Sequence, residues 1–221
     1  PEDNLVVRDL GFSGDTLTER PRSDNFGTPD EWLTKVEADV IFAFFGYNES
    51  YAGETGLPQF RKDLEEFIDH LVGQKYNGES APRLVLCSPI AFEDLKWPHL
   101  PDGKTQNKNL AMYSTAMAEV AQVKNVYFVG LFSATMKAQE QTTFDDSRIR
   151  NLQPEQRYRY GKERADGKID KTPLTMHGVH PVERGSLVIA ETVEQCLFDE
   201  AGSLSDPGIR GTLTSLVRKK N

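Results

Sequence analysis

Apolar residues along this chain follow two alternating patterns. Three short runs are apolar almost throughout, as expected for strands that are covered on both faces of a parallel sheet. Three longer stretches repeat apolar residues every three or four positions, as amphipathic helices do. The strand-like runs are residues 38–46, 83–90 and 126–132, and the helix-like stretches are residues 57–76, 109–125 and 185–202. Their alternation predicts a doubly wound α/β domain with a mainly parallel sheet.

Local signals add two elements near the amino terminus. The run "NLVVRDL" (4–10) is apolar and short, and we expect it to be a strand. The stretch "TPDEWLTKVE" (28–37) predicts a helix, because Thr28 suits the N-cap, Pro29 suits the first helical position and Glu31 completes a capping box. In the helix over 57–76, one stripe should face the core. It consists of Phe60, Leu64, Phe67, Ile68 and Leu71.

Two polar segments interrupt the alternation. Residues 92–108 are rich in proline, aspartate, lysine and asparagine, and residues 142–172 are highly charged. We expect the second to be an exposed insertion, either a surface loop or an arm that binds a partner. The predicted organisation is one domain over residues 1–203, followed by a helical extension over 204–221.

Composition excludes several classes of partner. The 221-residue chain has a net charge of −8 and a pI near 5.1. An acidic protein is a poor match for nucleic acid or for an anionic lipid surface. No apolar stretch approaches the roughly 20 residues that a membrane span needs. Cys87 and Cys196 both lie in apolar surroundings and are expected to be small core residues rather than a disulfide or metal framework.

The polar motifs that carry chemistry follow the predicted strands. Ligands of open α/β sheets bind beyond the carboxyl ends of the strands. There the sequence places Gly14 in a tight turn, Asn48 just after a buried strand, and His180 before the last helix. A backbone N–H and a side-chain amide can stabilise an oxyanion, and an imidazole can serve as general base and acid. Together they form part of a site for acyl transfer.

The three motifs "LGFSGDT" (10–16), "FFGYNES" (44–50) and "HGVHPVERG" (177–185) occur in this order. They resemble blocks II, III and V of the GDSL-like, or SGNH, hydrolases, over roughly residues 4–200. The resemblance implies a flavodoxin-like three-layer α/β/α sandwich that hydrolyses carboxylic esters without a cofactor. It also implies Gly14 and Asn48 as oxyanion donors and His180 as the base. The substrate would be a small acyl ester or an acetylated carbohydrate. The chain looks closest to such domains embedded in large multidomain bacterial proteins, and its compartment stays open.

The nucleophile is the first departure from the family pattern. "GDT" at 14–16 resembles the family's Gly-Asp-Ser block I, which would make Thr16 the nucleophile. Gly14 and Gly46 are only 32 positions apart, however, with room for one loop and one helix. That distance fits block II, so we expect the serine and the first strand to lie outside this chain. The sheet would then expose apolar edges, and an upstream segment, another chain or a rearrangement would complete it.

The orienting acid is the second departure. The family has aspartate three residues before its histidine, whereas this chain has His177. Loss of the charged orienter in a serine protease lowers turnover about ten-thousandfold. Asp170, Glu183 or a backbone carbonyl are candidate replacements. The alternative hypothesis is therefore a catalytically inactive relative, a binding or scaffold module within a larger assembly.

The remaining candidates are expected to line the crevice or to cap local structure. Those assigned to substrate binding are Ser13, Asp15, Tyr47, Glu49, Ser88 and His177. Trp97 is a further candidate for the pocket wall. His177 and His180 are spaced like a metal-binding pair, but no carboxylate pattern accompanies them and we assign no metal. His70 and His99 are expected at the surface.

Overall fold

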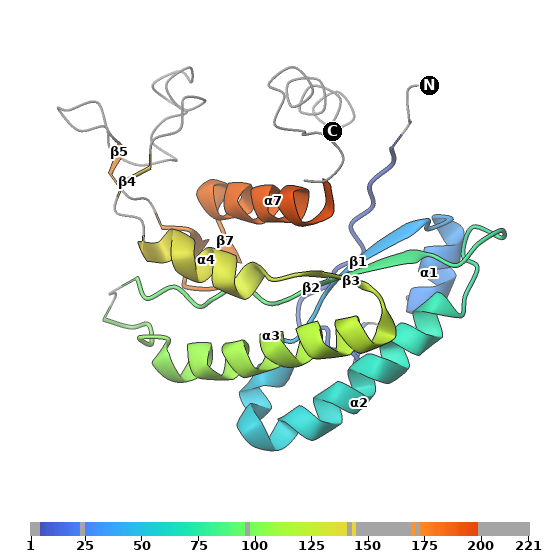
Figure 1. Ribbon diagram of the computed structural model, residues 1–221, viewed down its shortest axis with the longest axis horizontal. Helices are drawn as coiled ribbons and strands as arrows, with labels where there is room; N and C mark the ends of the chain where they lie inside the picture. The colour runs from blue at the N-terminus through green and yellow to red at the C-terminus, as the bar shows by residue number, and fades with distance from the viewer. Residues whose placement is uncertain are drawn as a thin grey trace. The chain divides into compact units, whose positions relative to one another are not determined.

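The computed structural model describes residues 5–22, 25–95, 98–140, 143–144, 169–170 and 173–198. The chain divides into two compact units, Pro1–Ser133 and Ala134–Asn221, which are described separately below. Figure 1 shows the path of the chain through both units.

The first unit is an α/β fold around a parallel sheet, which confirms the predicted class. Its strands are β1 (Val40–Phe44), β2 (Arg83–Cys87) and β3 (Tyr127–Val129), in the order β1-β2-β3. All pairs are parallel, with Phe42 beside Val85 and Cys87 beside Val129. The carboxyl ends of the strands therefore lie at one edge, where the polar motifs were expected to meet.

Helices flank this sheet. They are α1 (Pro29–Lys35), α2 (Gly53–Val72), which follows the short 3₁₀ helix η1 (Glu49–Ala52), and α3 (Lys104–Lys124). The predicted start of α1 is confirmed: Thr28 accepts a hydrogen bond from the Glu31 N–H, and the Glu31 carboxylate accepts one from the Thr28 N–H. α2 and α3 pack against each other along their length (Figure 1).

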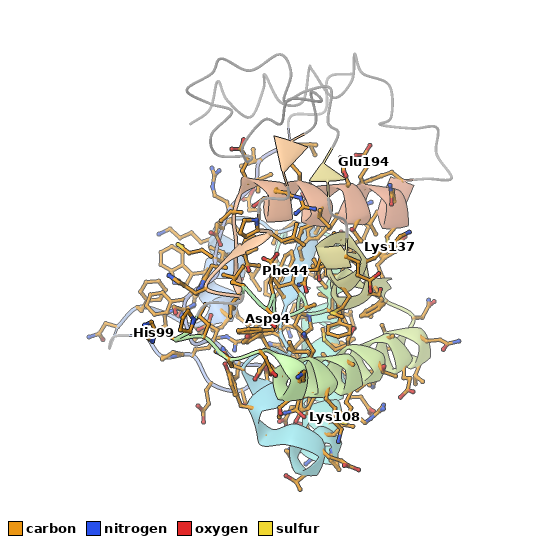
Figure 2. All side chains as sticks on the ribbon, turned by 90° about the vertical axis from the view of Figure 1, so that its left-hand side faces the viewer. Phe44, Asp94, His99, Lys108, Lys137 and Glu194 are labelled. Atoms are coloured by element: carbon orange, nitrogen blue, oxygen red, sulfur yellow. The ribbon has the colours of Figure 1, made fainter. Side chains whose placement is uncertain are left out.

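The core of the first unit lies between α2, α3 and one face of the sheet. Phe60, Leu64, Ile68 and Leu71 of α2 are buried as predicted, and Phe67 is half-buried beside them. They pack with residues of α3 and the sheet: Ala43, Leu84, Leu86, Tyr113, Ala116, Met117, Val120 and Ala121. The opposite side of α3 faces solvent, where Lys108 is labelled in Figure 2.

The predicted burial of β1 on both faces is wrong for one face. Ala43 is 3% exposed, whereas Phe42 is 44% and Phe44 56% exposed. Within the part of the chain that the structure describes, β1 is an edge strand, and alternate side chains of a strand point to opposite faces. The residues that face away from α2 and α3 are thus left open, as an incomplete sheet would leave them.

The amino-terminal run is not a strand. Residues 5–12 have no regular secondary structure, and Leu5, Val6 and Val7 are 72%, 56% and 83% exposed. An apolar segment becomes a strand only when a neighbouring strand accepts its hydrogen bonds and covers a face. Neither occurs for this run among the described residues.

The second unit contains short hairpins and a long helix. Its elements are β4 (Thr143–Phe144), β5 (Ile169–Asp170), β6 (Thr175–Met176), β7 (His180–Pro181) and α7 (Glu183–Phe198). β4 pairs with β5 and β6 with β7, both antiparallel. α7 confirms the helix predicted over 185–202 as far as Phe198, and it begins at Glu183. α4 (Leu131–Glu140) contains the boundary between the two units.

Three other expectations are corrected. α3 already begins at Lys104, inside the segment read as polar loop. The run 126–132 is a strand only to Val129, and its last residues begin α4, which was not predicted. Cys87 is buried as expected, but Cys196 is exposed on α7.

Several predictions fall outside the described residues. They are most of the insertion over 142–172, the extension over 204–221, and Trp97. Within the described ranges, no helix is both long and apolar enough to cross a membrane.

Candidate active site

The first candidate motif forms a tight turn at residues 11–17. The Asp15 N–H donates to the Phe12 carbonyl at 3.3 Å, and Gly14 between them has a φ of +89°. This left-handed conformation favours glycine, because it strains a residue with a Cβ. The Gly14 N–H makes no hydrogen bond within the described part of the chain and lies at an exposed position. It is therefore available to an acceptor from outside.

The second motif turns the chain directly after β1. Gly46 has a φ of +96°, and a Cβ there would lie 3.1 Å from the Met117 sulfur. The backbone conformation thus favours glycine, and any larger residue would also crowd the Met117 side chain. The turn places Asn48 at an exposed position at the start of η1. Ser50 behind it is fully buried and donates its hydroxyl to the Tyr47 carbonyl at 2.6 Å.

Side-chain hydrogen bonds join these two turns. The Asn48 amide donates to the Asp15 carbonyl at 2.9 Å. The Glu49 carboxylate accepts from the Leu17 N–H and from the Gly46 N–H, each at 2.9 Å. A primary amide carries two N–H groups, so the Asn48 side chain keeps a second donor. The structure therefore brings the predicted residues Gly14, Asp15, Asn48 and Glu49 together at the carboxyl end of β1.

Two arginines follow the first turn in the chain, and one of them binds it. The Arg22 guanidinium binds both Asp15 carboxylate oxygens, at 2.6 and 2.7 Å, and the two side chains are only 13% and 12% exposed. A bidentate pair of this kind fixes both partners. Arg20 stacks over the Phe45 ring at 4.9 Å, and its partial burial lowers the pKa of its guanidinium, while Asp15 and Glu49 act in the opposite direction.

The remaining first-unit candidates lie around this cluster. Ser13 is exposed in the turn itself. The Tyr47 ring meets the Tyr51 ring edge to face, and burial, followed by the effect of Tyr51, raises the pKa of the Tyr47 hydroxyl. Ser88 is 1% exposed and acts within the fold: its hydroxyl accepts from the Phe132 N–H and donates to the Pro89 carbonyl.

The histidine motif lies in the second unit, in the hairpin formed by β6 and β7. His177 occupies the turn with a φ of +60°, and His180 begins β7, directly before α7. Both side chains are exposed. The first turn of α7 packs closely against the residue before β6, because a Cβ on Gly185 would lie 2.1 Å from the Leu174 carbonyl oxygen. The fully buried Arg184 anchors α7 by donating to the Ala138 carbonyl at 3.2 Å.

The sequence gives no reason to assign a metal or a cofactor, and we assign neither. In the described ranges, no three histidine, cysteine, aspartate or glutamate side chains gather as metal ligands.

Sequence reasoning missed the contacts that organise the two turns. The sequence predicts no role for Arg20 and Arg22, and it predicts that Glu49 binds substrate. The bonds of Glu49 and Asn48 join residues 32 and 33 positions apart. The acidic turn followed by two arginines was the available signal for the Asp15 pair.

The fold and the joined turns define an α/β protein with a parallel sheet and polar groups at the carboxyl end of its first observed strand. No protein-family model matches the chain, and no curated protein matches it.

Solved structures do show similarity. Axe2, an acetylxylan esterase from Geobacillus stearothermophilus, matches with a TM-score of 0.42 and 13% identity over 73% of this chain and 60% of that one. A lipase/acylhydrolase from Enterococcus faecalis matches at 0.39 and 17%, covering 70% and 58%. LAE5, an alpha/beta hydrolase enzyme from the metagenome of Lake Arreo, Spain, matches at 0.42 and 16%, covering 75% and 64%. The chain thus spans about three fifths of the length of these structures.

Proposed function

We propose that this chain is a hydrolase domain of the SGNH type that acts on carboxylic esters of small molecules or acetylated carbohydrates. Gly14 and Asn48 would be the oxyanion donors and His180 the general base and acid. The observation that carries the proposal is the hydrogen-bonded joining of the two turns. It holds the Asn48 amide against the turn that presents the Gly14 N–H.

The proposed reaction needs a hydroxyl nucleophile, which we assign to a group outside this chain. The nucleophile's oxygen attacks the ester carbonyl carbon while His180 takes its proton. The carbonyl oxygen becomes an oxyanion that accepts from the Gly14 N–H and the Asn48 amide. Collapse breaks the bond to the alcohol, which receives the proton from His180, and leaves the acyl group on the nucleophile. Water that gives a proton to His180 then attacks this acyl ester, and the carboxylic acid leaves as His180 returns the proton to the nucleophile's oxygen. In the simplest assay, water supplies the attacking oxygen.

The rate of p-nitrophenyl acetate hydrolysis tests this proposal. His180→Ala should lower the rate to the uncatalysed level, and Asn48→Ala should lower it by about a hundredfold, as loss of one oxyanion donor does. His99→Ala is the matched control, because His99 is an exposed histidine of the loop before α3 (Figure 2). Equal rates for the wild-type, His180→Ala and His99→Ala proteins would refute catalysis by His180.

The second candidate is a non-catalytic binding or scaffold module. It is favoured by His177, a residue without negative charge where the resemblance expects an aspartate. A His177→Asp variant separates the two functions. A catalytic domain with a weak orienter should gain rate, because a carboxylate stabilises the imidazolium. A scaffold module should show no rate in either form.

We also propose that a further β-strand, from another segment or chain, pairs with the free edge of β1. The support is the exposure of Phe42 and Phe44 on an edge strand that has no charge or proline to protect it. Natural sheets usually block such edges, because unpaired backbone groups invite another strand.

Sedimentation measures this pairing. The wild-type chain should associate in a concentration-dependent way, and the double variant Phe42→Lys/Phe44→Lys should remain monomeric. Val123→Lys is the control, because Val123 on α3 is 79% exposed but lies on no sheet edge. A double variant that associates as strongly as the wild type would count against pairing at β1. A wild-type chain that is monomeric at every concentration would exclude a second copy of this chain as the source of the strand.

A further inference from the structure

Glu49 joins parts of the chain that no backbone pairing connects. Its two carboxylate oxygens have different partners: Oε1 accepts from the Leu17 N–H, and Oε2 accepts from the Gly46 N–H, three residues before it. Leu17 is 8% exposed and belongs to the hydrophobic core, so its N–H has lost most of its access to water. An unpaired donor in such a position is costly.

The two bonds sit on either side of the proposed oxyanion donors. Leu17 lies three residues after Gly14, and Gly46 lies two residues before Asn48. A single rigid carboxylate therefore sets the separation between the two turns. The Asn48 side chain, next to Glu49 in the chain, joins the same two turns through its bond to the Asp15 carbonyl.

The glutamate carboxylate satisfies both donors from this position. The carboxylate accepts at both oxygens, whereas a glutamine amide has one acceptor and presents its NH₂ to the other N–H. Aspartate keeps the charge but is one carbon shorter, a loss of about 1.5 Å of reach. The requirement is thus specific in both chemistry and length.

From these contacts we propose that Glu49 is a positioning residue, which holds the Gly14 and Asn48 donors in register by binding one backbone N–H of each turn. This inference rests on the proposed function for its kinetic consequence. The role differs from the substrate contact expected for Glu49 at first, because both of its oxygens are occupied within the fold.

Amide hydrogen exchange and amide NMR signals test the positioning directly. In Glu49→Gln, exchange at Leu17 or Gly46 should accelerate at least about tenfold, and the Asn48 side-chain amide signals should shift. Amides of β2 should keep their protection. Glu54→Gln makes the same change of charge five residues away, at an exposed position of α2, and should alter none of these signals. Unchanged exchange and signals in Glu49→Gln, or equal changes in Glu54→Gln, would overturn the proposal.

Kinetics then separate positioning from general stability. With p-nitrophenyl acetate, Glu49→Gln should lower kcat about tenfold with KM unchanged, and it should have little further effect in an Asn48→Ala background. An accelerated exchange with an unchanged kcat would overturn the role in positioning. If the wild-type rate equals that of His180→Ala, the proposed function fails. In that case the inference is tested by the Asn48 amide signals of Glu49→Gln alone. A shift of these signals supports it, and unchanged signals overturn it.

Discussion

Strands β1 and β2 lie side by side with the same length and nearly the same kind of sequence, "VIFAF" and "RLVLC". In β2, the four residues from Leu84 to Cys87 are at most 3% exposed, whereas in β1 only Ala43 is comparably buried. The difference lies in position, because among the described residues β2 has a paired strand on each side and β1 has one. An apolar run thus indicates that a strand can be buried, and the neighbouring strands determine whether it is buried.

The largest loss of stability is expected for a substitution in β2, the interior strand. Leu86→Ala should lower the free energy of unfolding by about 2–5 kcal/mol, because Leu86 is fully buried in the core and the surrounding side chains cannot fill the space. Urea denaturation followed by circular dichroism measures this loss. A loss below about 1 kcal/mol would mean that β2 is less tightly packed than its burial indicates.

A smaller loss of stability is expected for a hydrogen bond between the segments that precede the two strands. Tyr76, which precedes β2, donates its hydroxyl to the Asp30 carboxylate in the helix before β1, at 2.5 Å. Tyr76→Phe should destabilise the protein by about 1–2 kcal/mol near neutral pH.

The same bond predicts a pH dependence. Burial and then the bond to Asp30 raise the pKa of Tyr76 above its ordinary value of 10. The folded state therefore keeps a proton that the unfolded state releases, and the contribution to stability is complete below about pH 10 and lost as pH rises further. The stability difference between wild type and Tyr76→Phe should be constant from pH 7 to about 9 and shrink above about pH 10. A difference that grows in alkali would contradict this assignment.

Asn77 forms a second, weaker hydrogen-bonded connection between the segments that precede β1 and β2. Its amide donates to Asp39, just before β1, while its carbonyl oxygen accepts from the Glu79 and Ser80 N–H groups. Asn77→Ala should cost about 0.5–1 kcal/mol, because these groups are exposed and water replaces part of what is lost. Thermal unfolding measures the change, and Gln74→Ala, in the same connection but without a bond to the β1 side, is a suitable control.

The smallest effect on stability is expected at the open face of β1. Phe42→Thr should change the free energy of unfolding of the isolated chain by less than about 0.5 kcal/mol, because the ring is 44% exposed and threonine suits a strand. Denaturant titration at low protein concentration measures it. A loss approaching that of Leu86→Ala would show that this face is covered in solution.

Local patterns predicted elements well where short-range physics determines them. The capping box of Thr28 and Glu31 and the apolar stripe of α2 depend on residues within one or two helical turns, and both are confirmed. The three parallel strands followed from their apolar runs. The start of α3 and the whole of α4 were missed, because polar residues such as Lys104 and Thr105 carry little periodicity at a helix end.

The sequence by itself determined the α/β class and the glycine turns, and it drew attention to Gly14 and Asn48. Only the tertiary structure decided that Asn48 binds the Asp15 carbonyl, that Glu49 spans both turns, and that β1 is an open edge. The physical reason is distance along the chain. Helix caps and strand propensity act between near neighbours, whereas burial and these hydrogen bonds depend on segments more than 30 residues apart that folding alone brings together.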